Sequence, residues 1–293
     1  MSARFAWVLN LDAELELARA RRGYVPPRKL LAQLAEHGQS SRQLLGPNDL
    51  LLQPSAARPE EPAGLVGRAW CPTPLAIEQM LAAGITPEPH PEISVLRRVN
   101  HRLFAHELGG GLPGQCYVRS RQELQQLLAS QQRRWLLKRP LSFAGRGQLR
   151  VIGPLSDKQW TWIDASLGRD GLLLEPLVEP LTEVSLHGFV WRDGQHELGR
   201  ICRQIVSPRG AFESVRRLEE SELSRAEAGA VLQQGDRVAR ALLGAGYFGP
   251  FGIDAYRYLV NGERGFCELG EINARYTLGF VTGFPRHPSQ LEL

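Results

Sequence analysis

The dipeptide Asn261-Gly262 lies between two β-rich runs, residues 251–260 and 264–273. Asn-Gly is a strong hairpin signal because both residues accept the positive φ angles of a type I′ turn. The pattern therefore predicts two neighbouring antiparallel strands. This pairing constrains the fold most, because alternation along each strand decides which side chains share a face.

Polar residues gather on one face of the predicted hairpin. Glu271, Asn273 and Arg275 alternate along one strand, and Asp254 lies on its neighbour. Two carboxylates and a carboxamide oxygen are hard ligands of the kind that Mg²⁺ prefers, and a cation between the acids would relieve their repulsion. Arg275 could hold a phosphoryl group or a carboxylate in its planar fork. A polar outer face with a Glu–Arg ion pair is the alternative interpretation.

A second glutamate, Glu268, has the opposite parity from Glu271 on the same predicted strand. We expect Glu268 to point away from the polar face, unless a bulge at Gly270 shifts the register. The two glutamates are thus predicted to have different roles.

The order of the predicted elements indicates three sections in the 293-residue chain, a length that fits two or three units. Over residues 1–92 strands alternate with helices, which is typical of an α/β unit with a parallel sheet. A proline-containing linker follows at residues 85–93. We also predict a helix over 26–38, one continuous helix over 94–110 and a polar loop over 207–217.

Lys138 ends an apolar strand and precedes a stretch that contains Gly145 and Gly147. A strand, a glycine loop and another strand form a flap whose backbone N–H groups can close over phosphates. Lys138 would supply a point charge for the phosphate oxygens. A plain hairpin with a solvated lysine is the alternative.

Another apolar strand runs into Glu175 and then into a proline-containing crossing that leads to Glu183. Backbone groups at such a crossing can bind an adenine edge while apolar side chains enclose the ring. Glu183 could accept hydrogen bonds from ribose hydroxyls. An ordinary crossing between domains, with solvated acids, is the alternative.

Several other classes of function are disfavoured. The stretch at 109–114, GGGLPG, follows a helix and contains Pro113, so it does not fit a dinucleotide-binding loop and indicates a helix C-cap followed by a loop. The 35 basic and 31 acidic residues are scattered, which disfavours nucleic-acid binding. The four cysteines are widely spaced and are expected to be reduced. No apolar run approaches membrane-spanning length, so we expect a cytoplasmic protein without membrane contact.

The four features occur in a fixed order: lysine with glycine flap, glutamate-ended hinge, an Ile-Asp strand, and Glu-Ile-Asn-Ala-Arg. This order resembles the ATP-grasp superfamily over roughly residues 95–283, and the last motif resembles its E-x-N-x-R metal signature. The resemblance implies an α/β (α+β) fold of three parts. They are a pre-ATP-grasp α/β domain (1–92), a lid subdomain (93–178) and a metal-binding subdomain with an antiparallel sheet (179–293).

The resemblance also implies roles for particular residues. Asp254, Glu271 and Asn273 would bind Mg²⁺, with Mn²⁺ as an alternative, and Arg275 and Arg203 would hold the reacting carboxylate or oxyanion. Arg203 lies beside an arginine-bearing loop that could close over the second substrate. The residues expected to bind ATP are Arg102, Lys138, Ser142, Gly145, Gly147, Glu175, Leu177, Val178 and Glu183. Arg102 stands where many family members have a second phosphate-binding lysine.

The function implied by the resemblance is an ATP-dependent carboxylate–amine ligase that forms a carbon–nitrogen bond, with a thiol as an alternative acceptor. ATP would convert a small carboxylate substrate to an acyl phosphate, and an amino acid or peptide amine would then displace phosphate, leaving ADP. Two alternatives are a phosphotransferase on the same fold and a non-catalytic nucleotide-binding module. The sequence names neither substrate, and a homodimer is the default expectation.

Overall fold

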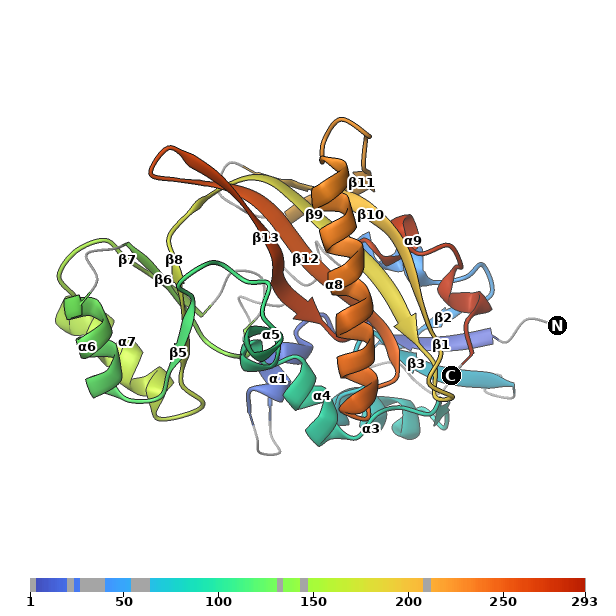
Figure 1. The fold of residues 1–293 in the computed structure, drawn as a ribbon. Helices are drawn as coiled ribbons and strands as arrows, with labels where there is room; N and C mark the ends of the chain where they lie inside the picture. The colour runs from blue at the N-terminus through green and yellow to red at the C-terminus, as the bar shows by residue number, and fades with distance from the viewer. Residues whose placement is uncertain are drawn as a thin grey trace.

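The computed structural model describes residues 4–19, 24–26, 40–53, 64–130, 134–142, 147–207 and 212–292. These residues form two sheets of four strands and one of five (Figure 1). The predicted α/β (α+β) mixture of parallel and antiparallel strands is confirmed. Among the described helices, none is long and apolar enough to cross a membrane.

The first sheet has the strand order β2-β1-β3-β4 and is parallel throughout. Its elements are β1 (Arg4–Val8), α1 (Ala13–Leu17), η1 (Arg42–Leu44), β2 (Leu50–Leu51), β3 (Leu65–Ala69), α3 (Pro74–Ala82) and β4 (Thr86–Pro87). As predicted, α3 follows Thr73 and has Pro74 at its first position, where proline costs no hydrogen bond. The helix predicted over 26–38 lies outside the described residues, apart from Pro26.

The second sheet, the lid sheet, is antiparallel with the order β5-β8-β6-β7. Its elements are β5 (Cys116–Val118), α6 (Arg121–Ser130), β6 (Trp135–Lys138), β7 (Gln148–Val151), α7 (Asp157–Leu167) and β8 (Leu172–Pro176). Trp135 and Leu137 pack in one core with Ile163 of α7. Alternation therefore turns Lys138 to the face that α6 and α7 leave uncovered, and Figure 1 shows this lobe beside the large sheet.

Two helices replace the single helix predicted over 94–110: α4 (Ile93–Val99) and α5 (Arg102–Leu108). The break coincides with Asn100, whose Nδ2 donates to the Leu96 carbonyl at 2.9 Å and whose Oδ1 accepts from the Ala274 N–H at 2.9 Å. His101 then caps α5 by accepting from the Leu103 N–H at 3.2 Å. The prediction of one helix was wrong because a side chain competes with the helical backbone there.

The third sheet is antiparallel with the order β11-β10-β9-β12-β13. Its strands are β9 (Glu179–Val190), β10 (His196–Val206), β11 (Phe212–Arg217), β12 (Gly249–Val260) and β13 (Glu263–Asn273). The predicted hairpin is confirmed, with φ of 51° at Asn261 and 85° at Gly262. The predicted loop over 207–217 is wrong for residues 212–217, because these pair with β10 as β11.

Helix α8 (Arg225–Gly244) covers one face of the third sheet (Figure 1). A Cβ at Gly235 would lie only 2.5 Å from a methyl group of Leu186, so Leu186 faces the helix. Alternation turns Ser185 and His187 of the same strand to the opposite face. Asp254 pairs with Ser185 in register and therefore shares that opposite face.

The segment after β13 returns to the first sheet and contains α9 (Phe280–Gly283) and η2 (Pro288–Gln290). The ring of Tyr276 lies 5.1 Å from that of Trp7, and both belong to the largest hydrophobic core. Arg68 is 1% exposed, and it forms a 2.6 Å ion pair with Glu88 and donates to the Leu291 carbonyl at 2.8 Å. The first sheet thus packs firmly against the third.

His187 is a buried neutral histidine on the face of the third sheet that α8 leaves free. Its side chain is flanked by the hydroxyls of Ser185, at 3.1 Å, and Thr277, at 2.9 Å. Burial lowers the pKa of His187 to about 4 from an ordinary value of 6.5. The unfolded chain therefore binds the proton more readily between these two values.

We expect acid to destabilise the protein through His187. The stabilising contribution is full above pH 6.5 and is lost as the pH falls through 4, because only the unfolded state accepts the proton in this window. The difference corresponds to roughly 3 kcal/mol of unfolding free energy. Urea titrations from pH 4 to 7 measure it, and His187→Gln should flatten the curve. An equal slope in the wild type and the variant would contradict the assignment.

Candidate functional site

The floor of the candidate site is the paired end of β12 and β13. Asp254 lies opposite Glu271 in register, and Gly252 lies opposite Asn273. The Nδ2 group of Asn273 donates to Asp254 Oδ2 at 3.1 Å. The structure thus brings together the three residues that the sequence assigned to a metal.

The surroundings of Asp254 disfavour the charged form of its carboxyl group. Burial, followed by the nearby charge of Glu271, raises the pKa of Asp254 to about 7, although hydrogen bonds from Gln204 and Asn273 act in the opposite direction. The Nε2 group of Gln204 on β10 donates to Asp254 Oδ1 at 2.5 Å. Gln204 was not identified from the sequence, because its contact reaches across β9 to β12.

These residues fit a hard divalent cation. Within the described residues, no group of three or more His, Cys, Asp or Glu side chains is arranged to hold a metal. The charged ligands of this site would therefore be two, Asp254 and Glu271, with a third ligand from a neutral side chain. Two neighbouring carboxylates, one of them held close to its protonated form, are a donor set that a cation stabilises by replacing the proton. Asn273 adds a neutral carboxamide oxygen.

Arg102 connects this floor to the flap. Its Nη2 lies 2.7 Å from Glu271 Oε1, and its Nη1 donates to Ser142 Oγ at 2.8 Å and to the Arg139 carbonyl at 2.5 Å. The side chain is 6% exposed, and its Nε atom has no hydrogen-bond partner in the described part of the chain. A buried cation with an unused donor between flap and floor is suited to phosphate oxygens.

The lid sheet supplies a second cation, which is partly buried. Lys138 Nζ lies 2.6 Å from Glu175 Oε2, and the two side chains are 13% and 3% exposed. Both residues lie on the lid-sheet face opposite the lid core, since Glu175 pairs in register with Leu136. Tyr256 of β12 lies close enough to Glu175 to sense its charge. The pKa of Tyr256 is raised mainly by burial, then by the charge of Cys267 and then by that of Glu175. The sequence did not single out Tyr256.

The hinge between lid and floor follows β8. The Leu177 N–H donates to the Arg134 carbonyl at 2.8 Å, while Val178 packs against Leu112 and Tyr258. Leu177 and Val178 line a cavity of about 830 Å³ beside the hinge. Further along β9, burial raises the pKa of Glu183, and the charge of Arg203 partly offsets the effect.

The flap is described in part. Gly147 has φ of 72°, and its carbonyl accepts from the Arg139 N–H at 2.8 Å. A Cβ at Gly147 would lie 2.9 Å from the Cβ of Ser142, so the chain passes tightly there. Gly145, the other predicted flap glycine, lies outside the described residues.

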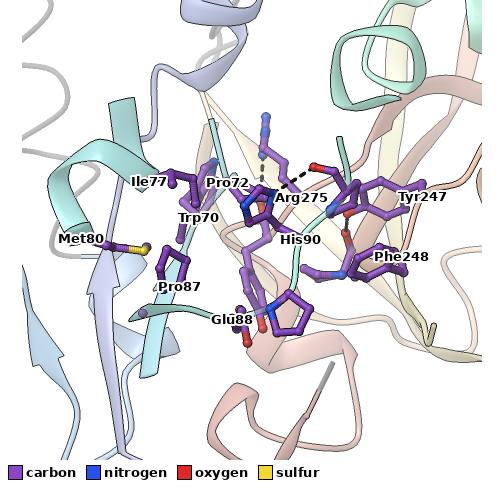
Figure 2. A pocket seen from close by; sticks show the side chains of 17 residues that line it. Trp70, Pro72, Ile77, Met80, Pro87, Glu88, His90, Tyr247, Phe248 and Arg275 are labelled. Atoms are coloured by element: carbon purple, nitrogen blue, oxygen red, sulfur yellow. Dashed lines mark hydrogen bonds between the residues drawn. The ribbon is translucent and has the colours of Figure 1, made fainter. Parts of the chain in front are cut away.

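Arg275 lies past the end of β13 in the interior. It forms an ion pair with Glu14 of α1 through Nε, and its Nη2 donates to Asn273 Oδ1 at 3.0 Å. Figure 2 shows Arg275 beside a cavity of about 30 Å³ that Trp70 and Tyr247 also line. That volume suits about one or two water molecules. Arg275 therefore positions Asn273 and fastens the first sheet, and nothing in the sequence pointed to Glu14 as its partner.

Arg203 lies on the other face of the third sheet from Asp254 and Glu271. It pairs in register with Val184, which has the parity of Leu186 and so faces α8. Its Nε lies 3.4 Å from Glu222 Oε1, and its Nη1 donates to the Glu183 carbonyl at 2.7 Å. Because side chains alternate along β10, the next residue, Gln204, is the one whose side chain lies on the floor.

A bulge interrupts β13 beside the metal residues. Asp254 pairs with Glu271, but Tyr256 pairs with Cys267, so the register shifts between them. The carbonyl of Gly110 accepts from the N–H groups of Glu268 and Leu269 at 3.0 Å each. The glycine stretch at 109–114 thus follows α5 and braces this bulge, in agreement with its interpretation as a loop.

Neither the family models nor the curated proteins gave a match to this chain. Solved structures do match. D-alanyl-alanine synthetase A from Vibrio cholerae O1 biovar eltor has a TM-score of 0.56 and 13% identity, over 99% of this chain and 94% of that chain. Carboxyaminoimidazole ribonucleotide synthase from Aspergillus clavatus, complexed with ATP, has a TM-score of 0.51 and 14% identity, over 100% of this chain and 78% of that chain.

Pyruvate carboxylase from Rhizobium etli has a TM-score of 0.58 and 15% identity, over 96% of this chain but only 27% of that chain. At sequence identities this low, the matches show a shared fold and nothing about activity. The two synthetases match over nearly all of this chain, and the order of parallel sheet, lid sheet and large antiparallel sheet follows the predicted three-part layout. The chain therefore has the ATP-grasp fold.

Proposed function

We propose that this protein is an ATP-dependent carboxylate–amine ligase that works through an acyl phosphate with Mg²⁺ and releases ADP and phosphate. The observation that carries the proposal is the pairing of an acidic floor with two cations, the buried Arg102 and the partly buried Lys138. An adenine nucleotide with a bound metal ion fits this pairing, because its phosphates would contact the two cations and its metal ion the acidic floor. The similarity to synthetases, one of them complexed with ATP, supports the same class.

These two cations are proposed to neutralise the phosphate oxygens. Both are already paired with carboxylates, Lys138 with Glu175 and Arg102 with Glu271. The nucleotide would take over these cations, and Glu271 would then be free to bind the metal. Leu177, Val178 and Glu183 are proposed to contact adenine and ribose, and Ser142 and Gly147 the phosphates.

The metal would be held by Asp254, Glu271 and Asn273, where it supplies charge neutralisation at the transferring phosphoryl group. Gln204 and Arg275 keep Asp254 and Asn273 in place through their hydrogen bonds. Asp254 must give up any proton it holds before it can ligate a metal. Arg203 has no step in this proposal, because its side chain lies on the face of the third sheet that α8 covers, where its Nε is 3.4 Å from Glu222 Oε1.

The proposed chemistry has two steps. A carboxylate oxygen of the substrate attacks the γ-phosphorus, the bond to the β–γ bridging oxygen breaks, and ADP leaves with the electron pair. The amine then attacks the acyl carbon, phosphate leaves, and the nitrogen loses a proton to give the amide. ATP, a small carboxylate and an amine are the proposed partners, and the cytoplasm is the proposed location.

A mass-spectrometric screen tests this function. Amino acids and peptides are incubated with ATP, Mg²⁺ and the protein, and we expect one ADP for each amide formed. The variant Lys138→Met should lose turnover by ~10²-fold or more, because a charge at the transferring phosphates is removed. AMP as the product would exclude the acyl-phosphate mechanism, and a stable phosphorylated product would identify a phosphotransferase instead.

A further inference from the structure

A third cavity, of about 270 Å³, lies between the first sheet's helix α1 and the lid. Its wall is formed by the end of α1, by the start of the flap and by the end of α7. Seven polar residues line it: Arg19, Tyr24, Arg139, Ser142, Ser166, Arg169 and Asp170. The cavity adjoins the candidate nucleotide site, because Ser142 accepts a hydrogen bond from Arg102.

Arg139 is fixed in the wall of this cavity. Its Nε donates to Ser166 Oγ at 2.9 Å, and its guanidinium carbon lies 4.7 Å from the ring centroid of Trp162. Burial lowers the pKa of Arg139, and the charge of Arg169 lowers it further. Two guanidinium groups therefore lie close enough to repel each other at one edge of the cavity.

These cations lack a carboxylate partner within the described residues. Arg19, Arg139 and Arg169 take part in none of the ion pairs that the described residues form. Asp170 also lines the cavity, but Arg97 donates to both of its carboxylate oxygens at 3.1 Å.

We propose that this cavity binds the anionic group, a carboxylate or a phosphate, of the substrate other than ATP. The proposal rests on the proposed ligase function. Guanidinium forks match both groups through paired N–H donors, and the cavity holds three arginines without carboxylate partners beside the flap. The competing explanation is that Arg139 and Arg169 serve only the negative end of α7, in which case no anion binds.

Titration calorimetry tests the site with two probes, inorganic phosphate and acetate, at constant ionic strength. A saturating non-hydrolysable ATP analogue with Mg²⁺ is present, so that the candidate phosphate site is filled. We expect one of the two probes to bind, and Arg169→Gln and Arg139→Gln to weaken it by ~10-fold or more. Preference for phosphate or for acetate identifies the class of group. Arg264→Gln, which removes the same charge from an exposed position on β13, should leave binding unchanged.

Two results would overturn the anion site. One is that neither probe binds, and the other is that both arginine variants bind as the wild type does. The affinity for the ATP analogue is measured separately and should be equal in the wild type and Arg169→Gln. If the wild type failed to bind the ATP analogue, that result would contradict the ligase proposal. Phosphate and acetate would then be titrated without the analogue, so the anion site would still be tested on its own.

Discussion

Glu271→Gln is expected to lower ATP-dependent turnover by at least ~10²-fold, the scale at which one preorganised electrostatic contact to a transition state acts. The substitution keeps the size of the side chain but removes one of two carboxylates on the floor. It should also lower the affinity for Mn²⁺, which electron paramagnetic resonance measures. Folding should persist, because Glu271 is 36% exposed and, among the described residues, forms an ion pair with Arg102 alone.

Glu263→Gln is the matched control for this prediction. Glu263 begins the same strand as Glu271 but is exposed at the hairpin end. It should leave both turnover and Mn²⁺ affinity unchanged. Equal losses in the two variants, or wild-type turnover in Glu271→Gln, would contradict the assignment of Glu271 to the metal.

Arg275→Met is expected to lower the unfolding free energy by about 3–5 kcal/mol, the range for breaking a buried ion pair by removing one partner. Glu14 would keep a buried charge without its cation, and Glu14 Oε2 already has no hydrogen-bond partner among the described residues. Asn273 would also lose its donor from Arg275. Urea denaturation measures the stability, and a shift in the Mn²⁺ affinity reports on Asn273.

Arg240→Met provides the comparison for the stability measurement. Arg240 is 72% exposed and pairs with Asp236 one helical turn away, an arrangement worth at most ~0.5 kcal/mol. The double variant Glu14→Gln with Arg275→Met should recover part of the loss, because it removes the unpaired charge. A loss in Arg275→Met no larger than that in Arg240→Met would contradict a buried role for this arginine.

The sequence allowed the local part of the site to be predicted. The Asn261-Gly262 turn fixes the pairing of β12 and β13, and this pairing brings Asp254, Glu271 and Asn273 together. The position of Lys138 at a strand end and of Glu175 before the hinge also followed from runs of apolar residues. Each of these inferences needed only alternation along a strand and the chemistry of the residue types.

Contacts between distant segments could not be predicted. Gln204 reaches Asp254 from another strand, and Glu14 reaches Arg275 from the first sheet. A difference of one residue along a strand also decided which side chain reaches the floor. Arg203 faces α8, whereas its neighbour Gln204 faces the floor. The break after α4 depends on a hydrogen bond between Asn100 and Ala274, which are 174 positions apart. Tertiary partners decide such features, and a single sequence does not contain their positions.

The most direct test of the account is a crystal structure with Mn²⁺ and a non-hydrolysable ATP analogue, in which anomalous scattering locates the metal. We expect a manganese peak within ligand distance of Asp254, Glu271 and Asn273, with Lys138 and Arg102 on the phosphates and the Arg102–Glu271 ion pair broken. A nucleotide bound elsewhere, or a metal peak away from these three residues, would contradict the central claim.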